Sequence, residues 1–504
     1  MREKPSCSRL VLIIVSLIII SCNVLSGTQS TDMPTSPTAT EGRAVEPVGT
    51  VKETEEPPEP EPTGQNTSPS HSGIEEKPLS NQGPWFVFST DTMLYAANPD
   101  GSGLTPISDA NPYSWTDLEY SAAARGGRLA MIVSDEERIM TGLTLQIITL
   151  PSLSVTSIPL TTEENEVDPA SPFKDERVEA ALSIVHGESL AWSPDSEKLA
   201  FFGAMDGPSA DLYVYDIGEE SLLRLTDGPT QGAYTLWSPD GEFIAHVGVT
   251  GFGSGAGWTM DRIWLAAADD SGVEELYDVP ERSGSEVLLG WLDEETLLVH
   301  SWFMNCGSKD LRTYNTNTGE TEIIWPDFFQ TVRFASETRT VLFSVTEDIV
   351  RCNTSQQHGI FMVDTDSTNP LRIMEDGSYT IEWFQDVELF AATVQGGYIS
   401  ISSAGEIIDL EKPSDSIGMP WMAPVTYRMA WTGAGCWVGS VTSGLDNPLE
   451  QIYTGETTYA AWSRDGDTLL FFSKEGLHTA AAPDFTPVLA APDITSSEGV
   501  WVLP

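Results

Sequence analysis

Residues 236–247 read LWSPDGEFIAHV, and the same pattern recurs as AWSPDSEKLA at 191–200 and as AWSRDGDTLL at 461–470. The tryptophan ends one strand, and the Ser-Pro-Asp-Gly that follows predicts a tight turn. Proline supplies a fixed φ there and glycine a positive one. The apolar residues that begin at Phe243 then start a second, antiparallel strand. The chain therefore repeats a β-hairpin.

Each copy is followed by two more candidate strands, such as DLYVYD at 211–216 and LLRLTD at 222–227. Four short antiparallel strands form a sheet whose large apolar residues need neighbouring sheets to cover them. Radial stacking of such sheets satisfies this need for every copy. The sequence predicts an all-β protein, a β-propeller of four-stranded blades.

The number of blades follows from fainter copies of the repeat. The anchors of the copies recur at intervals of about 38 to 54 residues. Fainter copies lie at Trp291, Phe334, Trp383, Trp421 or Trp431, and in SAAARGGRLAMIV at 121–133. Residues 84–108 match the later strands of a blade, and the C-terminal segment 499–503 is expected to add its inner strand and close the ring. The count reaches nine units; because two weak ones could merge, we predict eight blades within a range of seven to nine.

The N-terminus carries a targeting pattern. Three basic residues precede an apolar run at 10–20, which is too short to span a membrane. The run ends in Ser21-Cys22, which resembles the bacterial lipobox. The resemblance implies a signal peptide at 1–21, cleavage before Cys22, and a lipid on its thiol that anchors the protein to a membrane of the cell envelope, outside the cytoplasm. An ordinary signal peptide and a retained signal anchor are the alternatives.

Composition separates the remaining chain into two parts. Residues 22–83 are rich in Pro, Glu, Thr and Ser and lack aromatic residues, which is typical of a disordered tether. Residues 84–504 are rich in β-forming residues and tryptophan, and we assign them to the propeller. The formal net charge of −50 disfavours nucleic acid and suits a cation or a basic partner.

The unit W-S-P-D-G-x-x-[IL]-A is similar to the PD40 or WD40-like repeat of TolB-type propellers, over about residues 84–504. We expect a tether before this region in place of the α/β domain of TolB, and no hydrolase domain after it of the kind that prolyl oligopeptidase-type enzymes carry. The resemblance therefore implies a fold and protein binding, and it does not imply a reaction.

Motifs for catalysis or cofactors are weak. Ser189 in Gly187-Glu-Ser-Leu-Ala191 runs into a strand and lacks the strand-to-helix context of a nucleophile elbow. His246 and His300 occupy corresponding second strands, which favours packing. The glycine cluster 251–257 indicates a hairpin loop, and 364–369 lacks the glycine and distal glutamate of a calcium loop. We predict no catalytic residue, metal or cofactor, although the many carboxylates leave Ca²⁺ binding open.

Loop length points to a binding face. Connections between second and third strands are long at 203–210, 248–260, 301–309 and 346–359. In a propeller these loops emerge on one face, and exposed aromatic and arginine residues favour recognition there. The candidate binding residues are Trp258, Trp302, Met304, Arg351 and His358. The alternative is surface variation without function.

Cysteine positions support the alignment of the blades. Cys306 and Cys352 each follow the second strand of adjacent units, so they occupy matching loops. An oxidising compartment favours a bond between them. We predict a Cys306–Cys352 disulfide with Cys436 free, against the alternative of three separate thiols.

Two functions remain open. The first is a non-enzymatic, lipid-tethered propeller that binds a protein or an envelope polymer through the long loops. The second is an extracytoplasmic hydrolase of glycans or peptides that uses carboxylates converging near the ring axis.

Overall fold

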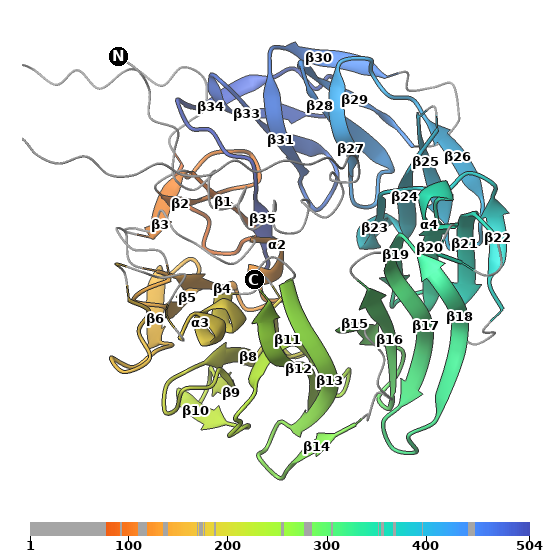
Figure 1. The fold of residues 1–504 in the computed structure, drawn as a ribbon. Coiled ribbons are helices and arrows are strands. Elements are labelled where there is room, and N and C mark those ends of the chain that lie inside the picture. The colour runs from red at the N-terminus through yellow and green to blue at the C-terminus, as the bar shows by residue number, and fades with distance from the viewer. Residues whose placement is uncertain are drawn as a thin grey trace, which may run out of the picture.

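The computed structural model describes residues 77–504, except for positions 91–92, 109–117, 135–139, 169, 171–174, 176, 186–187, 254–256, 277–284, 304–305, 351, 354–356, 366–368, 396 and 442–448. Within these residues nine antiparallel sheets surround one axis, so the fold is a β-propeller (Figure 1). We number the sheets as blades 1 to 9 and call the strand nearest the axis the inner strand.

The blades follow one another along the chain. Blade 1 consists of β35 (Val500–Val502), β1 (Trp85–Ser89), β2 (Leu94–Ala97) and β3 (Thr105–Ser108). Blade 2 consists of β4 (Arg128–Val133), β5 (Thr144–Thr149) and β6 (Ser154–Pro159). Blade 3 consists of β7 (Leu190–Trp192), β8 (Lys198–Gly203), β9 (Asp211–Asp216) and β10 (Ser221–Arg224). Blade 4 consists of β11 (Gln231–Trp237), β12 (Phe243–Gly253), β13 (Gly257–Ala267) and β14 (Val273–Glu275).

The second half of the ring has the same organisation. Blade 5 consists of β15 (Ser285–Trp291), β16 (Thr296–Phe303), β17 (Gly307–Asn315) and β18 (Thr321–Phe329). Blade 6 consists of β19 (Thr331–Ala335), β20 (Thr340–Val345), β21 (Gly359–Asp364) and β22 (Leu371–Met374). Blade 7 consists of β23 (Ile381–Phe384), β24 (Leu389–Val394), β25 (Gly397–Ser402) and β26 (Ile407–Leu410). Blade 8 consists of β27 (Ser416–Met422), β28 (Arg428–Gly433), β29 (Gly435–Ser440) and β30 (Glu450–Thr454). Blade 9 consists of β31 (Thr457–Trp462), β32 (Thr468–Ser473), β33 (Gly476–Ala481) and β34 (Val488–Pro492).

The blade count corrects the favoured expectation of eight. Every weak unit forms a sheet of its own, so none merges with a neighbour. Blade 2 has three described strands, and its innermost position is held by helix α2 (Leu118–Ser121) and by a single bridge between Ala122 and Leu129. The sequence around this unit keeps mainly the glycine and the second strand, so it is one of the weak units that the expectation of eight blades allowed to merge.

The two ends of the described chain close the ring, as the sequence predicted. Strand β35 pairs antiparallel with β1, which places Trp501 opposite Phe86. The amide of Gly127 in blade 2 also donates to the carbonyl of Leu503 at 2.6 Å. Strand β1 therefore has no unpaired inner edge, and a residue just after the C-terminal strand is also bonded to blade 2.

The repeated tryptophan joins neighbouring inner strands. The indole N–H of Trp237 donates to the carbonyl of Ala191 at 2.9 Å, and Ala191 directly precedes the equivalent Trp192 in the previous blade. The same bond recurs from Trp291 to Leu236 and from Trp462 to Trp421. Each of these bonds satisfies a buried indole donor and links two blades at once.

The turn after the tryptophan also has a repeated hydrogen-bond network. In blade 3 the hydroxyl of Ser193 donates to Asp195 at 2.6 Å, and the amide of Glu197 donates to the same carboxylate oxygen. These bonds hold the pKa of Asp195 below its usual value. The last turn position requires a positive φ, which Gly241 adopts in blade 4 at 74° and Ser196 adopts in blade 3 at 60°.

The packed region begins before residue 84. Residues 77–83, which composition assigns to the tether, contact blade 1. The carbonyl of Ser80 accepts a hydrogen bond from the Trp85 indole at 2.8 Å, and the amide of Ser80 donates to Asn98 at 2.7 Å. Leu79 packs against the apolar cluster of blade 1. Positions 1–76, including Cys22, lie outside the described residues.

Helices are few and short in the described part of the chain. Helix α3 (Val178–Val185) lies in the connection between blades 2 and 3, helix α4 (Glu347–Val350) follows β20, and the 3₁₀ helix η3 (Gln385–Val387) forms the turn after β23. Helix α3 was not expected from the sequence, although its buried Ala181 and Ile184 have helical spacing. Among the described residues, no helix is both long and apolar enough to cross a membrane.

Candidate binding face

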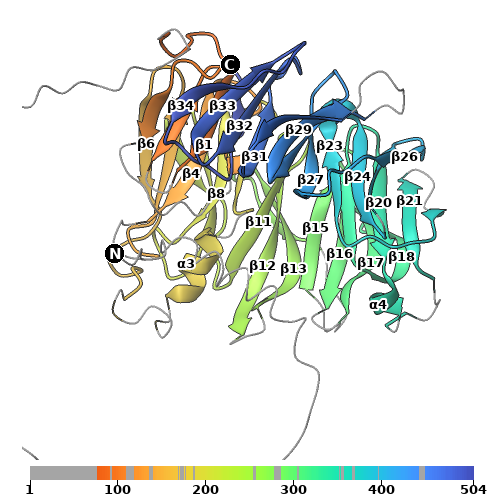
Figure 2. The same cartoon turned by 90° about the horizontal axis from the view of Figure 1, so that it is seen from above.

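Two faces of the ring differ in their connections. The Ser-Pro-Asp-Gly turns emerge on one face, which we call the short-turn face. The connections between second and third strands and those between blades emerge on the other, the long-loop face. Figure 2 shows α3 and α4 at one edge of the ring and the C-terminus at the opposite edge. The expectation that the long connections share one face therefore agrees with the order of the strands.

Part of the predicted loop structure is strand. The segment 248–260 extends the hairpin of β12 and β13, whose pairing continues to Gly253 and Gly257. In the next blade, β16 and β17 pair as far as Phe303 and Gly307. Glycine-rich composition indicates a loop, but glycine also forms extended strands, and these hairpins project from the blades as paired backbone.

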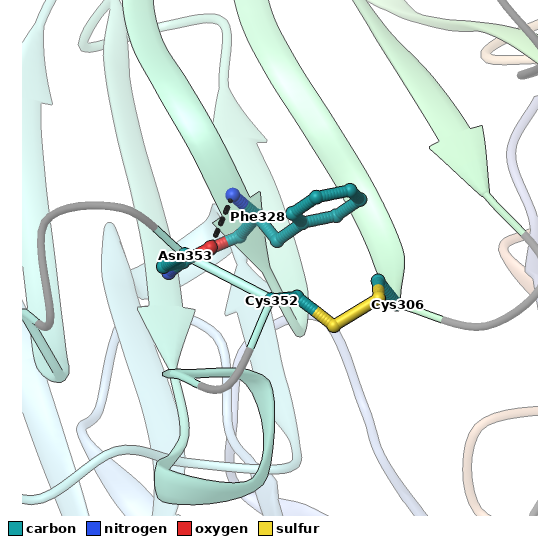
Figure 3. The surroundings of a disulfide bond; sticks show 4 residues. All are labelled: Cys306, Phe328, Cys352 and Asn353. Carbon is teal, nitrogen blue, oxygen red and sulfur yellow. Dashed lines mark hydrogen bonds between the residues drawn. A yellow bond between two sulfur atoms is a disulfide. The ribbon is translucent and has the colours of Figure 1, made fainter.

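A disulfide joins the long-loop connections of blades 5 and 6 (Figure 3). Cys306 lies between β16 and β17, and Cys352 follows α4; their Cα atoms are 6.1 Å apart. This is the pair predicted from the sequence, and Cys436 is a buried free cysteine on β29. Burial raises the pKa of the Cys436 thiol, which keeps it protonated.

Asn353 fixes the loop next to the disulfide. Its side-chain oxygen accepts from the amide of Phe328 at 2.7 Å, and its side-chain nitrogen donates to the Phe328 carbonyl at 3.0 Å (Figure 3). Asn353 is buried, and its side chain satisfies both the N–H and the carbonyl of Phe328, near the end of β18. The loop of blade 6 is thus attached to blade 5 by one covalent bond and two hydrogen bonds.

Aromatic side chains lie beside the Cys306–Cys352 disulfide and Asn353, which we together call the clamp. The rings of Phe303 and Phe328 meet edge to face at 5.5 Å, and the ammonium of Lys309 lies 5.3 Å from the Phe328 ring centre. Trp302, on β16, has 37% of its surface exposed. The exposed part of the Trp302 side chain therefore belongs to a covalently restrained part of the ring.

A second exposed aromatic residue lies on the same face, in the connection from blade 6 to blade 7. Tyr379 is 60% exposed, and its hydroxyl donates to Asp348 of α4 at 2.6 Å. That hydrogen bond raises the pKa of Tyr379 above its usual value. Tyr379 was not among the predicted binding residues, because only the connections within a blade were expected to form this face. The connections between blades emerge on it as well.

The structure places only some of the predicted binding residues. Trp302 lies beside the disulfide, and His358 is half-buried between α4 and β21. Trp258 belongs to β13 near the tip of its hairpin, paired with Phe252, and its side chain is not described. Met304 and Arg351 lie outside the described residues.

Charged groups also meet near the axis. Arg333 of β19 binds Glu382 of β23 through two guanidinium nitrogens, at 3.2 and 3.1 Å from one carboxylate oxygen. Glu188, just before β7, has a raised pKa because the protein around it desolvates its carboxyl group, and the charge of Arg333 partly opposes this rise. Tyr234 of β11 has a pKa raised by burial and by Glu188.

The other sequence candidates have structural explanations. The Ser189 hydroxyl is buried and donates to the carbonyl of Ile184 at 2.6 Å, which gives this side chain a structural role. Burial lowers the pKa values of His246 and His300 to about 4, which agrees with packing in the second strands. Within the part of the chain that the structure describes, no three His, Cys, Asp or Glu side chains are grouped to hold a metal ion.

Comparisons with known proteins show the fold and little more. No family model matches the chain. An uncharacterized peptidase, YuxL from Bacillus subtilis strain 168, is 41% identical over 63 residues, or 12% of this chain and 10% of the relative. The chain therefore matches only about a tenth of that relative's length.

Solved structures are similar in architecture at low identity. A eukaryotic initiation factor has a TM-score of 0.51 and 10% identity, with 83% of this chain and 98% of that chain covered. A dipeptidyl peptidase 4 from Porphyromonas gingivalis has a TM-score of 0.49 and 11% identity, with 76% of this chain and 60% of that chain covered. At these identities the likeness concerns the propeller alone.

Proposed function

We propose that the protein is an extracytoplasmic propeller, anchored by a lipid on Cys22, that binds a protein or an envelope polymer through its long-loop face. The observation that carries this proposal is the disulfide between neighbouring loops beside the exposed Trp302. A surface that is restrained before binding loses less conformational entropy when the partner arrives. Exposed aromatic residues supply large contact areas on such surfaces.

The disulfide also supports a location outside the cytoplasm. Disulfides persist in oxidising environments outside the cytoplasm and are rare inside it. The lipobox-like Ser21-Cys22 motif points to the same location on independent grounds.

The place where the N-terminal segment meets the ring predicts how the propeller is oriented relative to the membrane. Residues 78–80 bind Asn98, which lies in the turn between β2 and β3 on the short-turn face. A chain anchored through Cys22 thus reaches the ring on the face opposite the disulfide. The long-loop face would then be free to meet a partner beyond the membrane surface.

The net charge of the chain restricts the chemical class of partner that we propose. The net charge of −50 repels polyanions, including nucleic acids and phosphate-rich polymers. A basic or uncharged partner fits this surface better, with Trp302 and Tyr379 making the apolar contacts.

A pair of matched double variants tests the face. Trp302→Ala with Tyr379→Ala removes two exposed aromatic side chains of the long-loop face. Val425→Ser with Tyr427→Ala removes two side chains of the short-turn face that are 71% and 44% exposed. In capture from the native envelope, we expect the first variant to lose its partners at least tenfold and the second to keep them. Equal loss in both variants would reject the long-loop face.

The anchor has its own test. Cys22→Ala should abolish incorporation of a labelled fatty acid and release the protein from the membrane fraction or leave it uncleaved, because surface charge alone is of the wrong sign for anionic lipid. Labelling that is unchanged by this substitution would reject the lipid anchor.

A hydrolase is the second candidate. Its support is the desolvated Glu188 near the axis, since a carboxyl group with a raised pKa suits a general acid. Its weakness is that Glu382, the other axial carboxylate described above, is bound by Arg333. Turnover of peptides or glycans that disappears in Glu188→Gln would favour this candidate over binding alone.

A further inference from the structure

An ion pair is buried inside blade 5, in the same strands that carry Trp302. The guanidinium of Arg312, on β17, binds the carboxylate of Glu286, on β15, and the two side chains are 3% and 1% exposed. Arg312 therefore reaches from the third strand of the blade across β16 to the inner strand. Neither residue was a candidate in the sequence, because their contact depends on the registers of three strands.

Two further groups are bonded to this ion pair. The hydroxyl of Ser301, on β16, donates to the Glu286 carboxylate at 2.9 Å and accepts from the Arg312 guanidinium at 3.3 Å. The same guanidinium donates to the backbone carbonyl of Asp310 at 2.8 Å. Ser301 is fully buried, and Trp302 follows it directly. Glu286, Ser301 and Arg312, which we call the buried network, are therefore bonded to both strands of the hairpin formed by β16 and β17.

The buried network lies where the pairing of this hairpin is interrupted. Between β16 and β17 the register shifts at Asp310, whose φ of 55° is left-handed. An irregularity of this kind bends a strand and changes the direction of the side chains beyond it. The segment 301–309 beyond the shift carries Trp302 and Cys306. Pairing between β16 and β17 alone therefore does not fix the direction of this segment.

The segment 301–309 is held by side chains at two places. The buried network bonds its base to β15, and the Cys306–Cys352 disulfide bonds its tip to blade 6. The bonds of Ser301 and the disulfide thus restrain the chain on both sides of Trp302, whose side chain is partly exposed. The two restraints are independent, because one joins strands within blade 5 and the other joins two blades.

Stability alone does not explain the ion pair. Taking two charges out of water costs free energy that their mutual attraction returns only in part, and apolar residues of similar volume are often as stable in their place. Such a pair does restrict geometry, because a guanidinium and a carboxylate bond in few relative orientations. Here the restriction acts on three strands, since Glu286, Ser301 and Arg312 lie on β15, β16 and β17.

We propose that the buried network positions the segment 301–309, so that the long-loop face presents Trp302 in one orientation before a partner binds. Glu286 and Arg312 are positioning residues, since both are too deeply buried to touch a partner and act through Ser301. The consequence for binding rests on the proposed function of the long-loop face. The orientation of Trp302 does not, because it can be measured in the free protein.

Apolar substitutions separate positioning from stability. Glu286→Leu, Ser301→Ala and Arg312→Met together remove both charges and the hydroxyl group, so no unpaired charge stays buried and the denaturation midpoint should change little. Fluorine NMR of the full mature chain labelled with 5-fluorotryptophan reports on Trp302, whose signal is the one missing from Trp302→Phe. We expect one sharp Trp302 signal in the native protein and a broadened or split signal in the triple variant.

Two further variants make this result specific. Arg262→Met with Glu275→Leu removes a partly exposed ion pair from the neighbouring blade 4 and should leave the Trp302 signal unchanged. Ser301→Ala keeps the charges but separates them from β16, and it should broaden the signal to a smaller extent. If the triple variant does not fold, Ser301→Ala decides alone. A sharp, unshifted Trp302 signal in the folded variants of the buried network would overturn the proposal.

Capture of partners from a detergent extract of the native envelope tests the consequence for binding. Capture by the triple variant should fall by the factor by which the native Trp302 signal loses intensity, because only that fraction of molecules is ready to bind. A changed signal with undiminished capture would leave the positioning role intact and reject the long-loop face as the binding surface. Diminished capture with an unchanged signal would overturn the positioning role.

Discussion

Blades 3, 4 and 9 are each joined to the preceding blade in one way, and blades 5, 6 and 7 are joined to one another in a different way. Where the Trp-Ser-x-Asp motif is complete, as at Trp192, Trp237 and Trp462, an indole N–H donates to the innermost segment of the preceding blade. At the interfaces between blades 5, 6 and 7 the described residues lack that bond. Phe334 replaces the tryptophan in blade 6, and the buried Trp383 Nε1 of blade 7 has no hydrogen-bond partner there.

Other contacts replace the indole bond at these interfaces. The Cys306–Cys352 disulfide joins blades 5 and 6, and the guanidinium of Arg339 donates to the carbonyl of Leu292 at 2.6 Å. The Arg333–Glu382 ion pair and a hydrogen bond from Gln385 to Glu337 join blades 6 and 7. The repeat motif is therefore one of several ways to hold blades together, and blades without it can carry long, clamped loops.

Loss of the disulfide should destabilise the protein more than any other substitution considered below. Cys306→Ser with Cys352→Ser should lower the free energy of unfolding by about 2–4 kcal/mol, because the bond restricts the unfolded chain. Denaturant unfolding of the oxidised protein measures this. A reductant should destabilise the native protein and leave the double variant unchanged. An equal effect of reductant on both would show that the clamp contributes nothing.

Acidic pH should destabilise the ring through its buried histidines. The pKa values of His246 and His300 fall to about 4 in the folded protein, from an ordinary value of 6.5. The unfolded chain therefore gains protons below pH 6.5 that the folded chain does not. Stability is complete above pH 6.5 and is lost as the pH falls toward 4, by about 2–3 kcal/mol per histidine. His300→Phe should reduce this slope in urea titrations between pH 4 and 7, and an unchanged slope would argue against burial as the cause.

A matched pair of substitutions addresses the indole bond. Trp237→Phe leaves the Ala191 carbonyl without its partner and should cost about 1–2 kcal/mol more than Trp383→Phe, which removes an indole without a partner among the described residues. Denaturant midpoints of the two variants give the comparison. Equal losses would mean that the tryptophan acts by packing alone.

Truncation tests the start of the packed region. A chain beginning at Gln82 lacks the contacts of Leu79 and Ser80 with blade 1 and should lose about 1–2 kcal/mol. A chain beginning at Lys77 keeps them and should match the mature protein. If the two truncated chains unfold at the same denaturant concentration, the segment 77–81 adds no stability.

The repeat allowed the fold to be predicted, and its limits explain what was missed. The hairpins at Trp192, Trp237 and Trp462 defined the blade, and the closing strand 500–502 followed from the incomplete first unit. The favoured count was one short because two weak units were expected to merge. In blade 2, a bridge at Ala122 and helix α2 replace the inner strand, and no local pattern marks such a replacement.

The candidate sites depended on contacts between distant segments. The pairing of Cys306 with Cys352 followed from the alignment of two blades. Tyr379 could not be placed beside α4 without knowing that connections between blades share the long-loop face. The convergence of Glu188 and Arg333 from blades 3 and 6 depends on the radius of the ring, which composition and spacing do not encode.

Hydrogen exchange can locate the surface on which a partner binds. Exchange is measured for the mature protein alone and with a partner captured from the envelope. We predict slower exchange of backbone amides at 302–309, 346–353 and 375–380, where Trp302, the disulfide and Tyr379 lie, with no change in the short-turn segment 424–428. Slower exchange confined to 424–428 and the other short turns would show that partners bind the opposite face, and the proposed binding surface would be wrong.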